Sequence, residues 1–142
     1  GNIFMTSGIM ASRGYPTWDV GVVMDDFAEK HPDLVEAFLK AECEGIDYWI
    51  NNPKETAAII ATELELSLPD ATRMMRGTGM VPCSEQLTAG FMGTEGAEGE
   101  FADTLVATSE ILVAQERLPK LLTREDYSDF LVTSFLEKVV AE

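Results

Sequence analysis

The stretch GYPTWDVGVVMDDFAEKHPDLVEAFLKA, residues 14–41, decides the fold. Its segment WDVGVVM, residues 18–24, follows a loop with glycine and proline and is a short β-branched run typical of a buried strand. A pair of aspartates can then cap a short helix over 25–30. Pro32 restarts the chain, because proline fits the first turn of a helix but not its interior. The stretch therefore predicts a strand followed by two helices.

The chain beyond this stretch is predicted to be helical. The helix that begins at Pro32 should reach Asn51, because apolar residues recur there at spacings of three and four. Ser67 with Asp70 resembles a capping box in which an aspartate replaces the usual glutamate, and the same pattern recurs at 123–126. Further helices are predicted over 53–64, from Ser67 to before Gly77, over 84–91, over 100–115 and from Thr123 to near the C-terminus.

The remaining segments are predicted to be a second strand and several loops. Residues 2–5 form a short apolar run that indicates a strand, and residues 6–17 carry glycine and proline among small polar residues, which indicates a loop. Loops are also predicted over 77–82 and over the glycine-rich stretch 93–99. The first ten residues have neither the charged segment nor the apolar core of a secretory leader, so we expect the chain to begin within a fold.

Composition sets the class of the protein and narrows its partners. The 142 residues are 46% hydrophobic and include 25 acidic against 10 basic residues, for a formal net charge of −15. This is the length of one globular domain, and no apolar run approaches the roughly 18 to 20 residues that cross a bilayer. Ten scattered cations do not make a phosphate-binding surface, so we expect no nucleic-acid partner and no binding to an anionic membrane, whereas basic partners remain open.

The cysteines and the histidine do not indicate a metal site or an enzyme. Cys43 and Cys83 are far apart, and His31 is the one histidine, so a structural zinc site and any other cofactor are not expected. Two interpretations of Cys43 stay open, a small buried apolar residue on a helix face or a disulfide partner of Cys83. Because His31 directly precedes a helix-starting proline, no nucleophile and base can be assembled, and no catalytic residue is predicted.

One polar cluster stands out where the first loop meets the predicted strand. Tyr15, Thr17, Trp18 and Asp19 place an acid, a hydroxyl and two aromatic rings within five residues. A carboxylate at the beginning of an apolar strand is costly unless a partner pairs with it. Asp19 is therefore either held by hydrogen bonds within the protein or contacts a ligand.

The sequence resembles the C-terminal part of a periplasmic solute-binding protein of an ABC importer. The residues that carry the resemblance are the stretch 14–41, NNPKETAAIIA at 51–61, GTGMVPCSEQLTAGFMG at 77–93 and LPKLLTREDYSDFLVTSFLEKV at 118–139. The resemblance is strongest to the taurine- and sulfonate-binding branch of the nitrate, sulfonate and thiamine-precursor group. Pro16, Thr17, Asp19 and Val20 match the loop motif of that branch, and Trp18 departs from it.

The resemblance implies an α/β fold, the C-terminal portion of a two-lobed type II periplasmic-binding-protein fold, helix-rich with one or two short strands. Residues 1–24 would form hinge and cleft strands with their connecting loop, and residues 25–142 the helical C-terminal part of the first lobe. The fold would close on its ligand by hinge motion. The protein would be extracytoplasmic, in the periplasm, with its signal peptide outside this chain.

The resemblance also implies a non-enzymatic function, the binding of taurine or a related aminosulfonate and its delivery to a membrane permease. Asp19 would face the ammonium group of the ligand, because a buried cation needs an anion. Thr17 would add a hydroxyl, and Trp18 or Tyr15 would form a wall beside the two-carbon linker.

Other functions are consistent with the same residues. The ligand could be an alkanesulfonate, nitrate or a pyrimidine, although an acid at position 19 would repel a purely anionic ligand. The chain could instead be a helical protein-interaction domain for a basic partner, or part of a decarboxylase or pyrimidine-synthase enzyme with the same two-lobed fold. Because the helices have few strands to cover, we expect the chain to associate with itself or with an N-terminal half.

Overall fold

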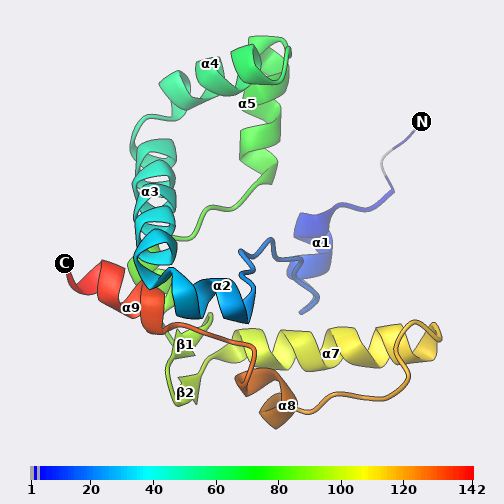
Figure 1. Cartoon of the computed structure of the whole chain (residues 1–142). Helices are drawn as coiled ribbons and strands as arrows, with labels where there is room; N and C mark the ends of the chain where they lie inside the picture. The colour runs from blue at the N-terminus through cyan, green and yellow to red at the C-terminus, as the bar shows by residue number, and fades with distance from the viewer. Residues whose placement is uncertain (1, 3) are drawn as a thin grey trace.

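The computed structural model describes residue 2 and residues 4–142, which form helices and one small sheet (Figure 1). The helices are α1 Ser7–Ala11, α2 Asp25–Lys30, α3 Pro32–Asn51, α4 Pro53–Glu63, α5 Leu68–Gly77, α6 Cys83–Gln86, α7 Glu100–Ala114, α8 Arg124–Ser128 and α9 Ser134–Ala141; the strands are β1 Gly93–Thr94 and β2 Ala97–Glu98. No helix in the described part of the chain is both long and apolar enough to cross a membrane.

Prolines divide the first half of the chain into separate helices, as the sequence predicts. His31 and Asn52 each precede a proline and leave the helical conformation, with φ and ψ near −136° and 51° and near −128° and 55°. The helices α3, α4 and α5 then form an arch in Figure 1, with α4 as its top. Small side chains on α4 and α5, Ala57 and Ala71, are buried where these two helices pack together.

The N-terminal half of α3 packs against α9 (Figure 1). Two ion pairs join the exposed sides of these helices. Lys40 Nζ lies 2.7 Å from a Glu142 carboxylate oxygen, and Lys138 Nζ lies 2.8 Å from Glu36. The apolar residues Val35 on α3 and Leu136 on α9 are buried. The C-terminal helix is thereby fixed to a helix that begins about one hundred residues earlier.

Cys43 and Cys83 form a disulfide, which ties α3 to the start of α6 with 5.7 Å between the two Cα atoms. The interpretation of Cys43 as a buried apolar residue is therefore wrong, and the disulfide interpretation is confirmed. Cys43 is only half-buried.

The glycine-rich stretch 93–99 is a β-hairpin and not the loop that its composition predicts. Gly93 pairs with Glu98 and Thr94 with Ala97, in antiparallel register. Gly93 has a φ of +78°, and a Cβ at this position would collide with the carbonyl oxygen of Ala97. A Cβ at Gly99 would likewise collide with the carbonyl oxygen of Phe91. The chain closes so tightly here that glycine is required at both positions.

The strand predicted over 18–24 does not form. This segment has no regular secondary structure, and Val22 and Met24 are 92% and 73% exposed. The physical reason is that a strand needs a hydrogen-bonded neighbour, and within the described residues the one sheet joins β1 to β2. Of the strand predicted over 2–5, Ile3 lies outside the described residues, and the other three have no regular secondary structure.

Three further predictions need correction. The loop predicted over 6–17 contains α1, whose N-cap Thr6 accepts a hydrogen bond from the backbone N–H of Ile9. The helix predicted over 84–91 is the single turn α6, because the chain must bend back to form the hairpin. The predicted terminal helix is divided into α8 and α9 at residues 129–133. The described part of the protein is thus helix-rich with one small sheet. The division of the chain into cleft strands over 1–24 and a helical lobe over 25–142 stays a prediction.

Candidate functional site

The residues predicted to bind a ligand lie in the irregular segment between α1 and α2. The backbone N–H of Tyr15 donates to the carbonyl of Met10 at 3.0 Å, and Gly14 has a φ of +88°, which turns the chain out of α1. Tyr15 is 54% exposed, and Thr17 is also exposed. The structure therefore places this part of the predicted site at the surface.

Trp18, a member of the predicted site, packs against distant parts of the chain. Its ring meets the ring of Phe91 edge-on, with 5.5 Å between centroids and 80° between planes. It meets the ring of Phe101 in the same way, at 6.2 Å and 86°. Edge-to-face pairs are the favoured arrangement of aromatic side chains. The Trp18 side chain thus anchors the segment to the turn before β1 and to the first turn of α7.

Phe91 and Phe101 form a supporting pair that the sequence reasoning did not identify. The backbone N–H of Phe101 donates to the carbonyl of Phe91 at 2.9 Å, and Phe101 is only 7% exposed. Both residues lie far along the chain from Trp18, so no local spacing connects them with it. The one available signal is that Phe91 belongs to the stretch 77–93, which carries part of the family resemblance.

Asp19 lies next to Trp18 and is exposed. Among the described residues, its carboxylate forms no ion pair and accepts no hydrogen bond. An exposed carboxylate is solvated, so its charge is available to a cation that approaches this surface. The role of Asp19, and those of Tyr15, Thr17 and Trp18, stay predictions.

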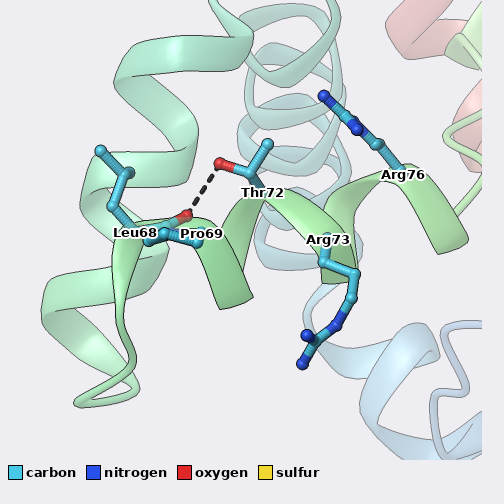
Figure 2. Close-up of a pocket in the computed structure, with 5 residues that line it drawn as sticks. All are labelled: Leu68, Pro69, Thr72, Arg73 and Arg76. Carbon is cyan, nitrogen blue, oxygen red and sulfur yellow. Dashed lines mark hydrogen bonds between the residues drawn. The ribbon is translucent and has the colours of Figure 1, made fainter.

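A shallow hollow of about 410 Å³ lies along one side of α5 (Figure 2), and none of the predicted site residues lines it. Thr72, which lines it, donates its hydroxyl to the carbonyl of Leu68 at 2.8 Å. Arg73 pairs with Asp70 at 2.7 Å, and its side chain points away from that of Arg76 in Figure 2. Because the two guanidinium groups diverge, they do not form a clamp for one anion.

Several groups at helix ends and helix contacts have shifted pKa values. The Ser67 hydroxyl and the Arg73 guanidinium lower the pKa of Asp70, and hydrogen bonds from Thr123 lower that of Asp126. The ion pair between Lys40 and Glu142 raises the pKa of the lysine and lowers that of the glutamate. These shifts report on structure, since each group has its partner within the fold. The described residues contain no group of three or more potential metal ligands.

Comparison with known proteins gives two matches. The family model described as "NMT1/THI5 like" matches residues 14–56, the region that contains the predicted site and the helices α2 and α3. The chain is also 27% identical, over 143 aligned residues, to the taurine-binding periplasmic protein of Escherichia coli (strain K12).

The second match covers 96% of this chain and 42% of that relative, so the chain spans less than half the length of the curated protein it matches. No solved structure matches the chain significantly. The two matches confirm the resemblance found in the sequence: residues 14–56 are similar to NMT1/THI5-like proteins, and the chain is similar to part of a taurine-binding periplasmic protein.

Proposed function

We propose that this chain is part of a solute-binding protein for taurine or a related aminosulfonate, which it delivers to an ABC permease in the membrane. The single observation that carries the proposal is that the family match begins at residue 14, so that it includes the segment Tyr15 to Asp19. In that segment, Trp18 is held by two aromatic rings and Asp19 keeps a carboxylate without a partner among the described residues.

The chemistry of an aminosulfonate suits these side chains. Its ammonium group would face Asp19, since a charge-assisted hydrogen bond to a carboxylate is among the strongest that a protein offers. Thr17 would add a hydroxyl oxygen, and the exposed side of Trp18 or Tyr15 would line the two-carbon linker. Residues 1–24 would contribute to the cleft and residues 25–142 to the helical C-terminal part of the first lobe. The sulfonate would be held by backbone N–H groups and hydroxyls, mostly at helix N-termini outside this chain.

An extracytoplasmic location is part of the proposal. The relative is named as periplasmic, and the Cys43–Cys83 disulfide fits an oxidising compartment, because disulfides are rare in the cytosol. A binding role without catalysis also agrees with the relative, which is named as a binding protein.

The test is calorimetric titration of the protein at its full native length with taurine, ethanesulfonate, nitrate and a lysine-rich peptide. Taurine should bind best, because it alone among these carries both an ammonium and a sulfonate group. A preference for ethanesulfonate or nitrate would mean that the protein is a solute-binding protein for a different small ligand. Binding of the peptide alone would overturn the proposal in favour of an interaction domain for basic partners.

A further inference from the structure

We infer that the Cys43–Cys83 disulfide positions the aromatic side of the proposed site, by holding the turn 83–92 where Phe91 meets Trp18. This link between the disulfide and Trp18 does not depend on the identity of the ligand. Its effect on ligand binding rests on the proposed function. Four structural steps connect the sulfur atoms to the site.

The first step is the attachment of the turn to α3. Cys43 lies within the long helix α3, and Cys83 is the first residue of α6. Helix α3 is itself held by α9 through the Lys40–Glu142 ion pair. The covalent bond therefore joins a short, single-turn element to the long helix α3.

The second step is the stiffness of the turn between Cys83 and Phe91. The side-chain amide of Gln86 donates to the carbonyl of Val81 at 2.9 Å, and the carbonyl of Gln86 accepts from the backbone N–H of Met92 at 2.9 Å. The backbone N–H of Phe91 donates to the carbonyl of Thr88 at 3.0 Å. These bonds close the turn on itself, so its two ends move together.

The third step is the contact of Phe91 with the proposed site. Its carbonyl accepts from the backbone N–H of Phe101 at 2.9 Å, and both rings meet the Trp18 ring edge-on. The fourth step concerns the backbone of the segment that carries Trp18. In the described structure, the backbone hydrogen bonds of residues 15–24 reach only residues 10, 27 and 28, which are near them in the chain. The two ring contacts therefore tie Trp18, and with it the neighbouring Asp19, to distant parts of the chain.

The alternative is that the disulfide is a staple that raises stability without acting on Trp18. A cross-link that closes a long loop stabilises a fold by restricting the unfolded chain, wherever it lies. The two views differ in what happens to Trp18 under conditions where the fold is intact.

Trp18 fluorescence separates them. The chain has two tryptophans, so Trp49→Phe leaves Trp18 as the sole emitter. In this background, at low temperature and without ligand, we expect Cys43→Ser/Cys83→Ser to shift the Trp18 emission to the red and to raise its acrylamide quenching constant about twofold, with an unchanged helical circular dichroism signal. If the serine pair loses its helical signal, Cys43→Val/Cys83→Ala replaces it in the same measurement.

Three variants that keep the disulfide provide the controls, two at Phe91 and one at Phe38. Phe91→Leu should reproduce the spectral change, and Phe91→Tyr should retain the ring and restore the parent spectrum. Phe38→Leu, at a residue of α3 that is 59% exposed, should leave the spectrum unchanged. Unchanged Trp18 emission and quenching in the cysteine variants, together with a lower melting temperature, would overturn the inference and leave only a staple.

Taurine titration of the protein at its full native length, with the same substitutions, links the inference to function. Phe91→Leu should weaken taurine binding by about 2- to 10-fold, the equivalent of one aromatic pair. If the fluorescence link holds and taurine does not bind the parent protein, the proposed function alone fails. If taurine binds parent and Phe91→Leu equally, the positioning role at the ligand site fails while the proposed function stands.

Discussion

Glu137 on α9 accepts a hydrogen bond from the backbone N–H of Glu95, with 2.7 Å between its Oε1 and that nitrogen. The same oxygen accepts the hydroxyl of Thr133 at 2.8 Å. Glu95 begins the two-residue turn of the β-hairpin, so the C-terminal helix holds the hairpin at its tip. On the other side, Arg124 donates to the carbonyl of Glu98 at 2.5 Å. The hairpin is thus fixed by side chains from α8 and α9.

Glu137→Ala should destabilise the protein by about 1 to 2 kcal/mol, because it leaves a backbone donor and a hydroxyl without their charged acceptor. Glu137→Gln should cost less than half as much, since its amide oxygen can still accept. Urea unfolding followed by circular dichroism measures both. Glu110→Ala, at an exposed residue of α7, is the matched control and should stay within about 0.5 kcal/mol of the parent. Equal losses in the alanine variants of Glu137 and Glu110 would contradict the anchoring role.

Gly99→Ala and Gly45→Ala should have opposite effects on stability. A Cβ at position 99 collides with the Phe91 carbonyl, so the backbone of the hairpin must shift, and we expect a loss of about 1 to 3 kcal/mol. A Cβ at position 45 meets open space in the middle of α3, so alanine should raise stability by about 0.5 to 1 kcal/mol. Thermal unfolding of the two variants tests this. Destabilisation by both would contradict the prediction.

The capping aspartates should make stability depend on acid pH. The pKa of Asp126 is lowered by the backbone N–H and the hydroxyl of Thr123, at 2.7 and 2.8 Å. A lowered pKa means that the folded state favours the carboxylate. Its stabilisation is therefore complete above the ordinary aspartate value of 3.8 and is lost as the pH falls through the lower folded value.

The comparison of Asp126→Asn with the parent in urea isolates this effect. The difference between their unfolding midpoints should be largest near neutral pH. It should shrink below about pH 4, where the Asp126 carboxylate of the parent becomes protonated and loses its charge. Asp47→Asn, at an exposed position of α3, is the control and should show a small difference at every pH. If the difference between the two unfolding midpoints grows as the pH falls, the predicted direction of the pH dependence is wrong.

The helix boundaries could be predicted because their causes are local. Pro32, Pro53 and the hydroxyls of Ser67 and Thr123 act within three or four residues, and each stands at the start of a helix in the structure. The hairpin was not predicted, because its glycines look like loop residues. It is held by Arg124 and Glu137, which lie far along the chain.

The failure of the predicted strand 18–24 has the same origin, since a β-branched run becomes a strand only with a partner strand. For the candidate site, the sequence identified Trp18 and Asp19 as unusual neighbours. It could not identify Phe91 and Phe101 as the rings that hold Trp18, because that contact depends on the tertiary fold.

Asp19→Asn should weaken taurine binding by about 2 to 5 kcal/mol, because a neutral amide cannot balance a desolvated ammonium group. The binding of ethanesulfonate, which has no ammonium group, should be unchanged or stronger. Calorimetry of the full-length protein measures both ligands, and Asp47→Asn provides a control at an acid of the α3 surface. Equal losses for the two ligands would mean that Asp19 has a structural role.

The apolar surface of this chain should make it associate with itself. Phe4, Val22, Met24 and Phe130 are 91%, 92%, 73% and 75% exposed, and they are part of a larger set of exposed apolar residues. Monomeric proteins rarely leave large contiguous apolar patches in water. The segment 18–24 adds unpaired backbone groups, which can pair with the same segment of a second copy. We therefore expect association to involve this segment.

Light scattering over a range of concentrations measures this association. The chain should show a mass above the 15.6 kDa of one copy, rising with concentration, and should bind a dye that reports exposed apolar surface. Val20→Thr/Val22→Lys should lower the mass, since a charged side chain disfavours strand pairing. Leu64→Lys, at an exposed residue after α4, should have a smaller effect because it lies outside the segment. A concentration-independent mass of one copy without dye binding would show that these apolar side chains do not drive association.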